Sequence, residues 1–163
     1  MTLRSAERRI IAAVLLLLAA GTGFALAHEG AKGVVKERMD LMKGQAKQMK
    51  LIGDMAKGKK KFDAAKAAAA AHDLGLTTKK IPELFPEGSN GHPSEALDAV
   101  WKDWDRFKGD AQDAEAAANA LAAALEASGE DWKPSFQKMT DACKSCHETF
   151  RAKEEEGQEG HHH

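Results

Sequence analysis

The chain has 163 residues, of which 43% are hydrophobic, with 24 Lys and Arg against 25 Asp and Glu. This length and composition allow about one soluble domain and exclude a large multidomain enzyme. The net charge of -1 gives no basic excess for a phosphate backbone, so nucleic acid is not expected as a partner. The 2 cysteines are too few for a disulfide-dense scaffold.

The first 27 residues have the order of a secretory signal peptide. A basic start, MTLRSAERR, precedes an apolar run from Ile10 to Ala20, and Ala25-Leu26-Ala27 supplies a small-x-small cleavage pattern. An uncleaved membrane anchor is the alternative, but a spanning helix needs about 20 apolar residues, and Gly21 interrupts the run early. We therefore expect cleavage of residues 1–27, export to a bacterial periplasm and no stable membrane anchor afterwards. The exported chain then carries a net charge of -3.

Two amphipathic helices are predicted before residue 80. From Ala31 to Ala56 apolar residues recur every three or four positions, with lysines largely between them. Gly58 ends this helix, and Lys59-Lys60-Lys61 form a solvated connection whose positive charge suits a helix C-terminus. Asp63 is a candidate N-cap for a second, alanine-rich helix, which Gly75 weakens toward its C-terminal end.

Two further helices are predicted after an irregular connection. Residues 81–93 hold three of the 4 prolines and form the longest connection in the chain. A third helix is expected to start at Ser94 and run to Ala127. Its apolar stripe consists of Leu97, Val100, Trp101, Trp104, Phe107 and Ala111. The fourth helix begins around Pro134. It repeats Phe136, Met139, Cys143, His147 and Phe150 on one face.

The fold class follows from these four helices. Tyr is absent, β-branched residues are scarce, and no alternating apolar run predicts a strand. Four amphipathic helices with short connections share one core most economically in an antiparallel four-helix bundle, so we expect an all-α domain over residues 28–153. Residues 154–163 form a charged tail that ends in three histidines, and we expect it to be disordered and assign it no function.

The motif that carries chemistry is Cys143-Lys144-Ser145-Cys146-His147. The C-x-x-C-H spacing is typical of a c-type haem attachment site. Each thiol can form a thioether with one vinyl group of the haem, and His147 then lies beneath the iron as its proximal axial ligand. A structural zinc site would need a second pair of cysteines, and a thioredoxin-like C-x-x-C would accompany strands; the sequence shows neither. We therefore predict one covalent haem c, which also occupies both thiols of an exported chain.

The chain resembles the class II cytochromes c, the cytochrome c′ family, over residues 34–153. The resemblance rests on CKSCHETFR near the C-terminus of the expected bundle and on RMDLMKGQAKQMKLIGDMAKG in the first helix. The LFPEGS connection and the W-x-x-W-x-x-F stripe also fit. The family implies a homodimer built through the first two helices. Leu41 and Leu51 on the outer face suit such a dimer, and they suit ordinary exposed aliphatic residues equally well.

The residue opposite His147 decides the function. By the resemblance, the fourth residue after Arg38, which is Met42, points at the distal haem face. The segment DLMKGQAKQM is more similar to the low-spin, methionine-ligated branch of the family than to its gas-binding branch. Coordination by Met42 favours single-electron transfer between periplasmic redox proteins, whereas an open iron binds nitric oxide or carbon monoxide. Met39 and Met49 are the fallback ligands, and methionines at such positions are otherwise core residues.

Two arginines complete the candidate site. By the resemblance, Arg38 pairs with a haem propionate, and its ordinary alternative is a surface pair with Asp or Glu. Arg151 follows His147 by four residues on the same helical face and flanks the proximal pocket in the family, or else it is a solvated cation at a helix C-terminus. A peroxidase would need a distal His or Arg as an acid–base group, and the distal helix offers chiefly Met42. We therefore expect a haem-binding carrier and not an enzyme.

Overall fold

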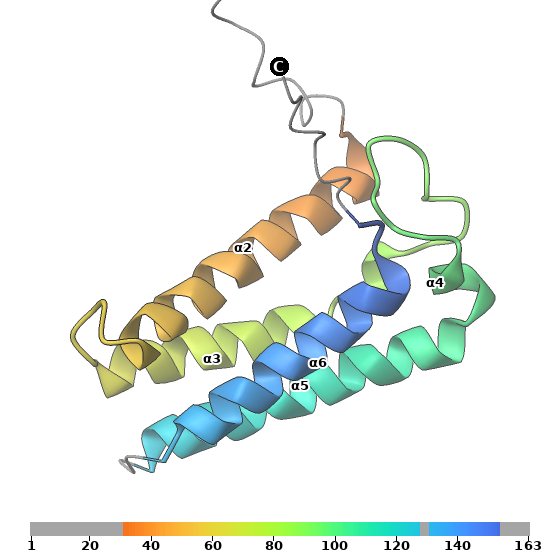
Figure 1. Cartoon of the computed structure of the whole chain (residues 1–163). Coiled ribbons are helices and arrows are strands. Elements are labelled where there is room, and N and C mark those ends of the chain that lie inside the picture. The colour runs from red at the N-terminus through yellow and green to blue at the C-terminus, as the bar shows by residue number, and fades with distance from the viewer. Residues whose placement is uncertain (1–30, 128–130, 154–163) are drawn as a thin grey trace, which may run out of the picture.

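The computed structural model describes residues 31–127 and 131–153, and these ranges contain helices and no strand beyond one isolated bridge. The helices are α2 (Gly33–Ala56), α3 (Ala64–Thr78), the short 3-10 helix η1 (Pro82–Leu84), α4 (Ala99–Lys102), α5 (Trp104–Glu126) and α6 (Lys133–Phe150). Figure 1 shows α2, α3, α5 and α6 as the four long members of one bundle. The expected signal peptide and the charged tail lie outside the described residues.

The α2–α3 hairpin forms as predicted, with one small difference at its start. α2 begins at Gly33, two residues after the predicted start. Gly58 turns the chain after α2 with a φ of 69°, a left-handed value that glycine adopts without a steric penalty. The Asp63 carboxylate accepts a hydrogen bond of 3.0 Å from the Lys66 backbone N–H, which confirms the predicted N-cap of α3.

α3 continues through Gly75 to Thr78 instead of weakening there. Gly75 is buried against α5, and a Cβ at this position would lie 2.5 Å from Oδ1 of Asn119. The missing side chain therefore lets α3 and α5 approach closely. This contact offsets the cost of about 1 kcal/mol that glycine carries inside a helix.

The third predicted helix begins later than the sequence indicated. The expected start at Ser94 is wrong, because α4 begins only at residue 99 and Asp103, with φ -125° and ψ 55°, then separates α4 from α5. The backbone before α4 hydrogen-bonds to the end of α6 instead, where the Leu97 N–H donates to the Phe150 carbonyl at 2.9 Å. This hydrogen bond joins parts of the chain that are far apart in sequence, and it competes with helix formation before residue 99. Local periodicity gives no sign of such a contact.

α6 begins as predicted, with Pro134 in its first turn.

The bundle contains two clusters of buried apolar residues. The first cluster joins all four long helices, with Ile52, Met55, Ala67, Ala68, Ala70, Ala71, Leu74, Ala118, Leu121, Ala122, Leu125, Trp132 and Met139. The second lies around α4 and the C-terminal end of α6, with Ile81, Phe85, Val100, Phe107, Ala111 and Phe150. Each fully buried leucine contributes roughly 2 kcal/mol by removal from water.

Several apolar residues are more exposed or more buried than the sequence predicted. Trp101 and Trp104 are half-buried beside the second cluster, and Leu97 is 40% exposed. Leu41 and Leu51, expected on the outer face of the first helix, are partly buried against the two clusters. These two leucines therefore pack within the chain itself.

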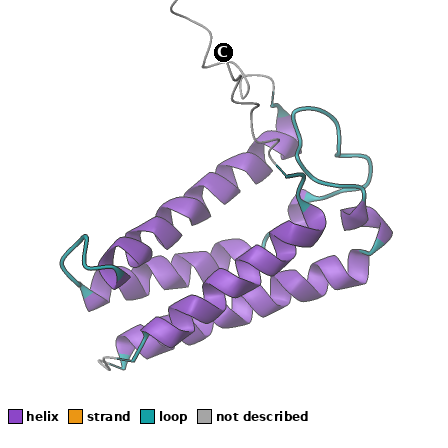
Figure 2. Ribbon diagram, in the orientation of Figure 1, coloured by secondary structure: helices purple, strands orange, loops and turns teal. Residues whose placement is uncertain are grey.

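The helices connect at the two ends of the bundle, and the longest connection joins α3 to α4 (Figure 2). In the described ranges we find no helix that combines the length and apolarity needed to cross a bilayer. α2 packs mainly on α3 and much less on α6. The wide spacing of α2 from α6 leaves room for the site described below.

Candidate functional site

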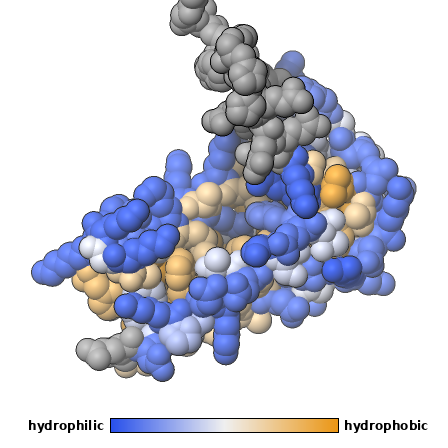
Figure 3. Space-filling model, in the orientation of Figure 1, coloured by the Kyte–Doolittle hydropathy of each residue, from blue (hydrophilic) through white to orange (hydrophobic). Residues whose placement is uncertain are grey.

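A cavity of about 430 Å³ opens between α2 and α6. On the face shown in Figure 3, apolar residues gather along the centre and hydrophilic residues surround them. The aliphatic part of the cavity wall includes Val35, Ala46, Ile81, Val100, Ala111 and Ala114. A large apolar cavity with a few polar groups is typical of a cofactor site.

Cys143, Cys146 and His147 all line this cavity from α6. Both cysteines are partly buried free thiols in this structure. Burial raises the pKa of both thiols, and for Cys146 the negative charge of Asp110 adds to burial and the pKa reaches about 11. The two thiols are therefore protonated at neutral pH in the haem-free chain.

His147 lies at the exposed mouth of the cavity. Partial burial there lowers the pKa of its imidazole, and the positive charge of Arg151 lowers it further, against a smaller opposing effect of Glu95. The neutral imidazole is thus favoured at pH 7. A neutral ring nitrogen is the form that coordinates a metal.

The predicted distal residues face the same cavity from α2. Met42 lines it together with Met39 and Met49. Met42 is partly buried against the second cluster, which also contacts Cys146, whereas Met49 packs against the first cluster beside Cys143. The structure therefore brings the predicted ligand, both fallback ligands and the C-x-x-C-H motif around one cavity.

Arg38 is buried and holds the α3–α4 connection in place. Its Nε and Nη2 donate to the Leu84 carbonyl at 3.2 and 3.0 Å, and Nη1 donates to Ser94 Oγ at 2.8 Å. Nη2 also donates to Ser89 Oγ at 2.7 Å. With 6% of its surface exposed, Arg38 is not the surface ion pair considered as its ordinary alternative. One N–H of Nη1 has no acceptor among the described residues, and Arg38 is one of the residues that line the cavity.

Arg151 lines the cavity but follows α6 rather than belonging to it. Its backbone is extended, with φ -114° and ψ 137°, so the expectation that it shares a helical face with His147 is wrong. The backbone pairs instead with Ala96 in an isolated antiparallel bridge. The side chain donates from Nε to Glu95 Oε2 at 2.7 Å. Arg151 therefore reaches the cavity through contacts with the α3–α4 connection.

Asp110 is a residue of the cavity wall that the sequence analysis did not single out. Its Oδ2 atom is buried and has no hydrogen-bond partner among the described residues. Asp110 follows Phe107 by three positions on α5, so a carboxylate within an apolar stripe was the available signal. A buried oxygen without a partner indicates a position where a bound group or water completes the site.

Two thiols and a neutral imidazole that face an apolar cavity from one helix define a c-type cytochrome on a four-helix bundle. The sequence pattern of the family described as Cytochrome C' matches residues 33–151. Cytochrome c′ of Rhodopseudomonas palustris is 35% identical over 145 residues, which cover 88% of this chain and 96% of that protein.

Two solved structures show the same architecture. Cytochrome c prime from Shewanella frigidimarina superposes with a TM-score of 0.70 at 30% identity, over 74% of this chain and 94% of that chain. A nitric oxide complex of a cytochrome c prime variant from Alcaligenes xylosoxidans gives a TM-score of 0.68 at 26% identity, again over 74% of this chain and 94% of that chain. The chain belongs to the cytochrome c′ family.

The family assignment confirms the predicted fold class and the predicted cofactor. Proteins of this family bind haem c covalently, and Cys143 and Cys146 supply the two thiols that such attachment needs. The cavity fits the group, because its wall is largely apolar and its polar atoms include a neutral imidazole and an available arginine N–H. The assignment does not distinguish a methionine-ligated iron from a five-coordinate one.

Proposed function

We propose that this protein is a single-electron carrier of a bacterial periplasm and not an enzyme. The observation that supports this function best is that Met42 and His147 line one cavity from the facing helices α2 and α6. The haem supplies an iron that alternates between the ferric and ferrous states. The protein's own residues hold it, set its axial ligands and limit the access of water.

In this proposal Cys143 and Cys146 attach the haem. The two residues are one turn apart on α6, so both sulfurs lie on the cavity side of the helix. Each thiol would add across one vinyl group, with its sulfur bonded to one carbon and its hydrogen transferred to the other. No electron leaves the pair of reactants, so the step needs no oxidant. His147 then coordinates the iron from the proximal side.

Met42 is proposed as the distal ligand. A thioether sulfur opposite an imidazole raises the reduction potential and fills the sixth coordination position, which favours electron transfer over gas binding. Met42 extends from α2 beside the second cluster and faces α6 across the cavity. Met39 and Met49 line the same cavity and remain the fallback ligands.

The two arginines are proposed to orient the haem. The fixed guanidinium of Arg38 has one Nη1 N–H left for a propionate, and a charge-assisted hydrogen bond of this kind is stronger than a neutral one. Arg151 is proposed to flank the proximal side, where its charge already lowers the pKa of His147. This charge helps to keep the imidazole neutral for coordination.

A five-coordinate, gas-binding protein is the second candidate function. The cavity is lined along α2 from Val35 to Met49, and the sixth coordination position would be open on this side if Met42 only packs over the haem. The solved nitric oxide complex at 26% identity belongs to a protein of the same architecture. The occupancy of the sixth coordination position separates the two functions.

Optical spectra of the haem-loaded protein test the proposal. We expect a sharp low-spin spectrum in the reduced form that carbon monoxide barely changes. Met42→Ala is expected to become high-spin and to bind carbon monoxide at once, whereas Met39→Ala, the matched control on α2, keeps the low-spin spectrum. A broad high-spin spectrum of the unaltered protein would contradict Met42 ligation and support the gas-binding function.

Export and assembly belong to the same proposal. We propose that residues 1–27 are removed, that residues 28–153 form the cytochrome domain and that periplasmic redox proteins are the partners. N-terminal sequencing of the haem-loaded protein should begin at His28.

We also propose a homodimer through α2 and α3, and sedimentation equilibrium should then give twice the mass of one chain. A monomer at all concentrations tested would contradict the dimer alone.

A further inference from the structure

The loop between α2 and α3 carries an unusual concentration of positive charge. Five lysines fall within ten residues, interrupted by one aromatic residue and one acidic residue. We call these lysines and the aromatic residue the basic loop surface; they are Lys57, Lys59, Lys60, Lys61, Phe62 and Lys66. All six are exposed. The loop lies at one end of the bundle, whereas the C-terminal end of α6 lies toward the other end (Figure 1).

The charge of the basic loop surface is only partly offset within the described part of the chain, by Asp54 near Lys59 and Lys60 and by Asp63 in the loop itself. Elsewhere among the described residues, five lysines pair with an acidic residue about one turn away, as Lys36 does with Asp40. In contrast, no lysine of the basic loop surface forms a salt bridge with a residue in the described ranges. Of the nearest acidic groups, Asp54 forms its salt bridge with Lys50, and Asp63 accepts a hydrogen bond from the Lys66 backbone N–H. The loop thus carries five lysines against one aspartate in a chain whose net charge is -1.

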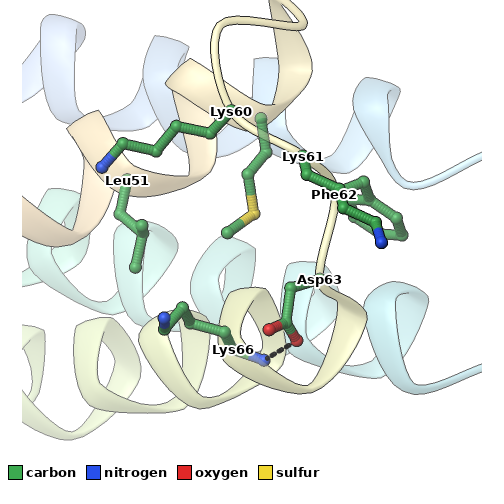
Figure 4. A pocket seen from close by; sticks show the side chains of 7 residues that line it. Leu51, Lys60, Lys61, Phe62, Asp63 and Lys66 are labelled. Atoms are coloured by element: carbon green, nitrogen blue, oxygen red, sulfur yellow. Dashed lines mark hydrogen bonds between the residues drawn. The ribbon is translucent and has the colours of Figure 1, made fainter.

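The same surface contains a pocket that is lined by both charged and apolar side chains. The pocket has a volume of about 390 Å³. Its lining residues are Leu51, Met55, Lys60, Lys61, Phe62, Asp63 and Lys66. Figure 4 shows Leu51 and Lys60 on one side of this pocket and Phe62 on the other. The pocket therefore brings lysines and one carboxylate together with three apolar side chains.

Phe62 is held in its exposed position by a buried partner. Its ring stacks on Trp132 with centroids 5.3 Å apart and an interplanar angle of 8°. Phe62 is 44% exposed while Trp132 is 4% exposed. The ring is thus fixed beside the lysines with one side in solvent. Fixing it in the free protein lowers the entropy lost when it is buried on binding.

We propose that the basic loop surface docks this protein on an anionic phospholipid bilayer. Clustered lysines beside an exposed aromatic ring are typical of surfaces that bind anionic lipid headgroups while the ring enters the interface. The surface contains no arginine. Protein interfaces favour arginine, which forms paired hydrogen bonds with carboxylates, and are depleted in lysine. The diffuse charge of a lipid surface fits these lysines better than an acidic protein does.

Docking through this loop leaves the haem site free. The pocket of the basic loop surface and the cavity between α2 and α6 share no lining residue. A chain bound by its lysine end would present the cavity away from the loop and keep it open to redox partners. The inference goes beyond electron transfer and holds for either ligation state of the iron.

Vesicle sedimentation tests the inference with the haem-loaded protein purified after export. We expect binding to vesicles of phosphatidylglycerol and phosphatidylcholine, weakening as salt rises, and no binding to phosphatidylcholine alone. A triple variant with Lys59→Gln, Lys60→Gln and Lys61→Gln should bind about 100-fold more weakly, from roughly fivefold per lysine near an anionic surface. Phe62→Ser should weaken binding while its salt dependence stays unchanged.

A matched triple variant controls for net charge. Lys79→Gln, Lys80→Gln and Lys102→Gln remove the same charge from exposed positions outside the loop and should leave binding unchanged. Equal losses in the two triple variants would overturn the inference, because net charge alone would then explain binding. Absence of binding to anionic vesicles would overturn it as well, and so would binding to an acidic peptide in preference to the vesicles.

Discussion

The guanidinium carbon of Arg38 lies 3.8 Å from the centre of the Phe85 ring, so α2 is tied to the α3–α4 connection by a cation over an aromatic face. The same guanidinium donates to a backbone carbonyl and to two serine hydroxyls of that connection. Burial lowers the pKa of Arg38, although the group remains charged at neutral pH. One side chain thus closes one end of the haem cavity.

Loss of the Arg38 side chain should destabilise the fold. Arg38→Ala leaves several partly buried acceptors without a donor, and we expect the free energy of unfolding to fall by about 3 kcal/mol. Chemical denaturation of the haem-loaded protein measures this change. Lys36→Ala on the same helix, which breaks only an exposed ion pair, should cost less than about 1 kcal/mol. Equal costs for the two variants would show that the Arg38 contacts contribute little.

The thiol of Cys146 should titrate far above its ordinary pKa in the folded haem-free chain. In a Cys143→Ser variant, thiolate absorption measures Cys146 alone, and the absence of Tyr removes the usual interference. The pKa of about 11 arises mainly from burial and also from the charges of Asp110 and Cys143, so this variant should titrate between 9.0 and about 11. Adding Asp110→Asn should lower the pKa further, because a nearby negative charge opposes ionisation. A midpoint at the ordinary thiol value would contradict the burial of Cys146.

The same pKa shifts make the stability of the haem-free chain depend on alkaline pH. The folded chain retains the thiol protons to higher pH than the unfolded chain, whose thiols ionise near 9.0. The contribution to stability is therefore complete below about pH 9 and is lost as the pH rises toward 11. Urea unfolding from pH 8 to pH 11 measures it. The haem-loaded protein should lack this component of the pH dependence, because its thioethers do not ionise.

Asp110 should also lower the reduction potential of the haem. A buried negative charge beside the cavity stabilises ferric more than ferrous iron, so Asp110→Asn is expected to raise the potential. The change is roughly 1 kcal/mol, on the order of 40 mV for one electron. Redox titration compares this variant with Asp113→Asn, an exposed position on the same helix that should change the potential little. A lowered potential in Asp110→Asn would contradict the placement of this carboxylate beside the haem.

The contribution of the Asp63 N-cap to stability should be measurable separately from the effect of its negative charge near the lysines. Asp63→Ala removes the acceptor of the Lys66 N–H and should lower the free energy of unfolding by about 1 kcal/mol. Asp63→Asn keeps an oxygen acceptor and should retain most of the stability, although it removes the same negative charge. Thermal unfolding compares the two variants. Equal destabilisation would assign the effect to charge instead of the cap.

The sequence alone determined the chemistry and most of the helices. The C-x-x-C-H motif places Cys143, Cys146 and His147 within five consecutive residues, so one helix brings them together whatever surrounds it. Helix periodicity and the Asp63 cap depend on contacts within a few residues, which sequence patterns report directly. The predicted bundle and the covalent haem c followed from these local features together with the family resemblance.

Only the tertiary structure decided how the rest of the site is assembled. The extended backbone of Arg151 and the serine partners of Arg38 both depend on hydrogen bonds between segments far apart in the chain. Among the described residues Asp110 Oδ2 is buried without a hydrogen-bond partner, and this becomes apparent only when α5 packs against α6. Such contacts form only when the helices pack. Burial of the shared core then offsets the entropy cost of closing long loops. No local sequence pattern therefore encodes these contacts.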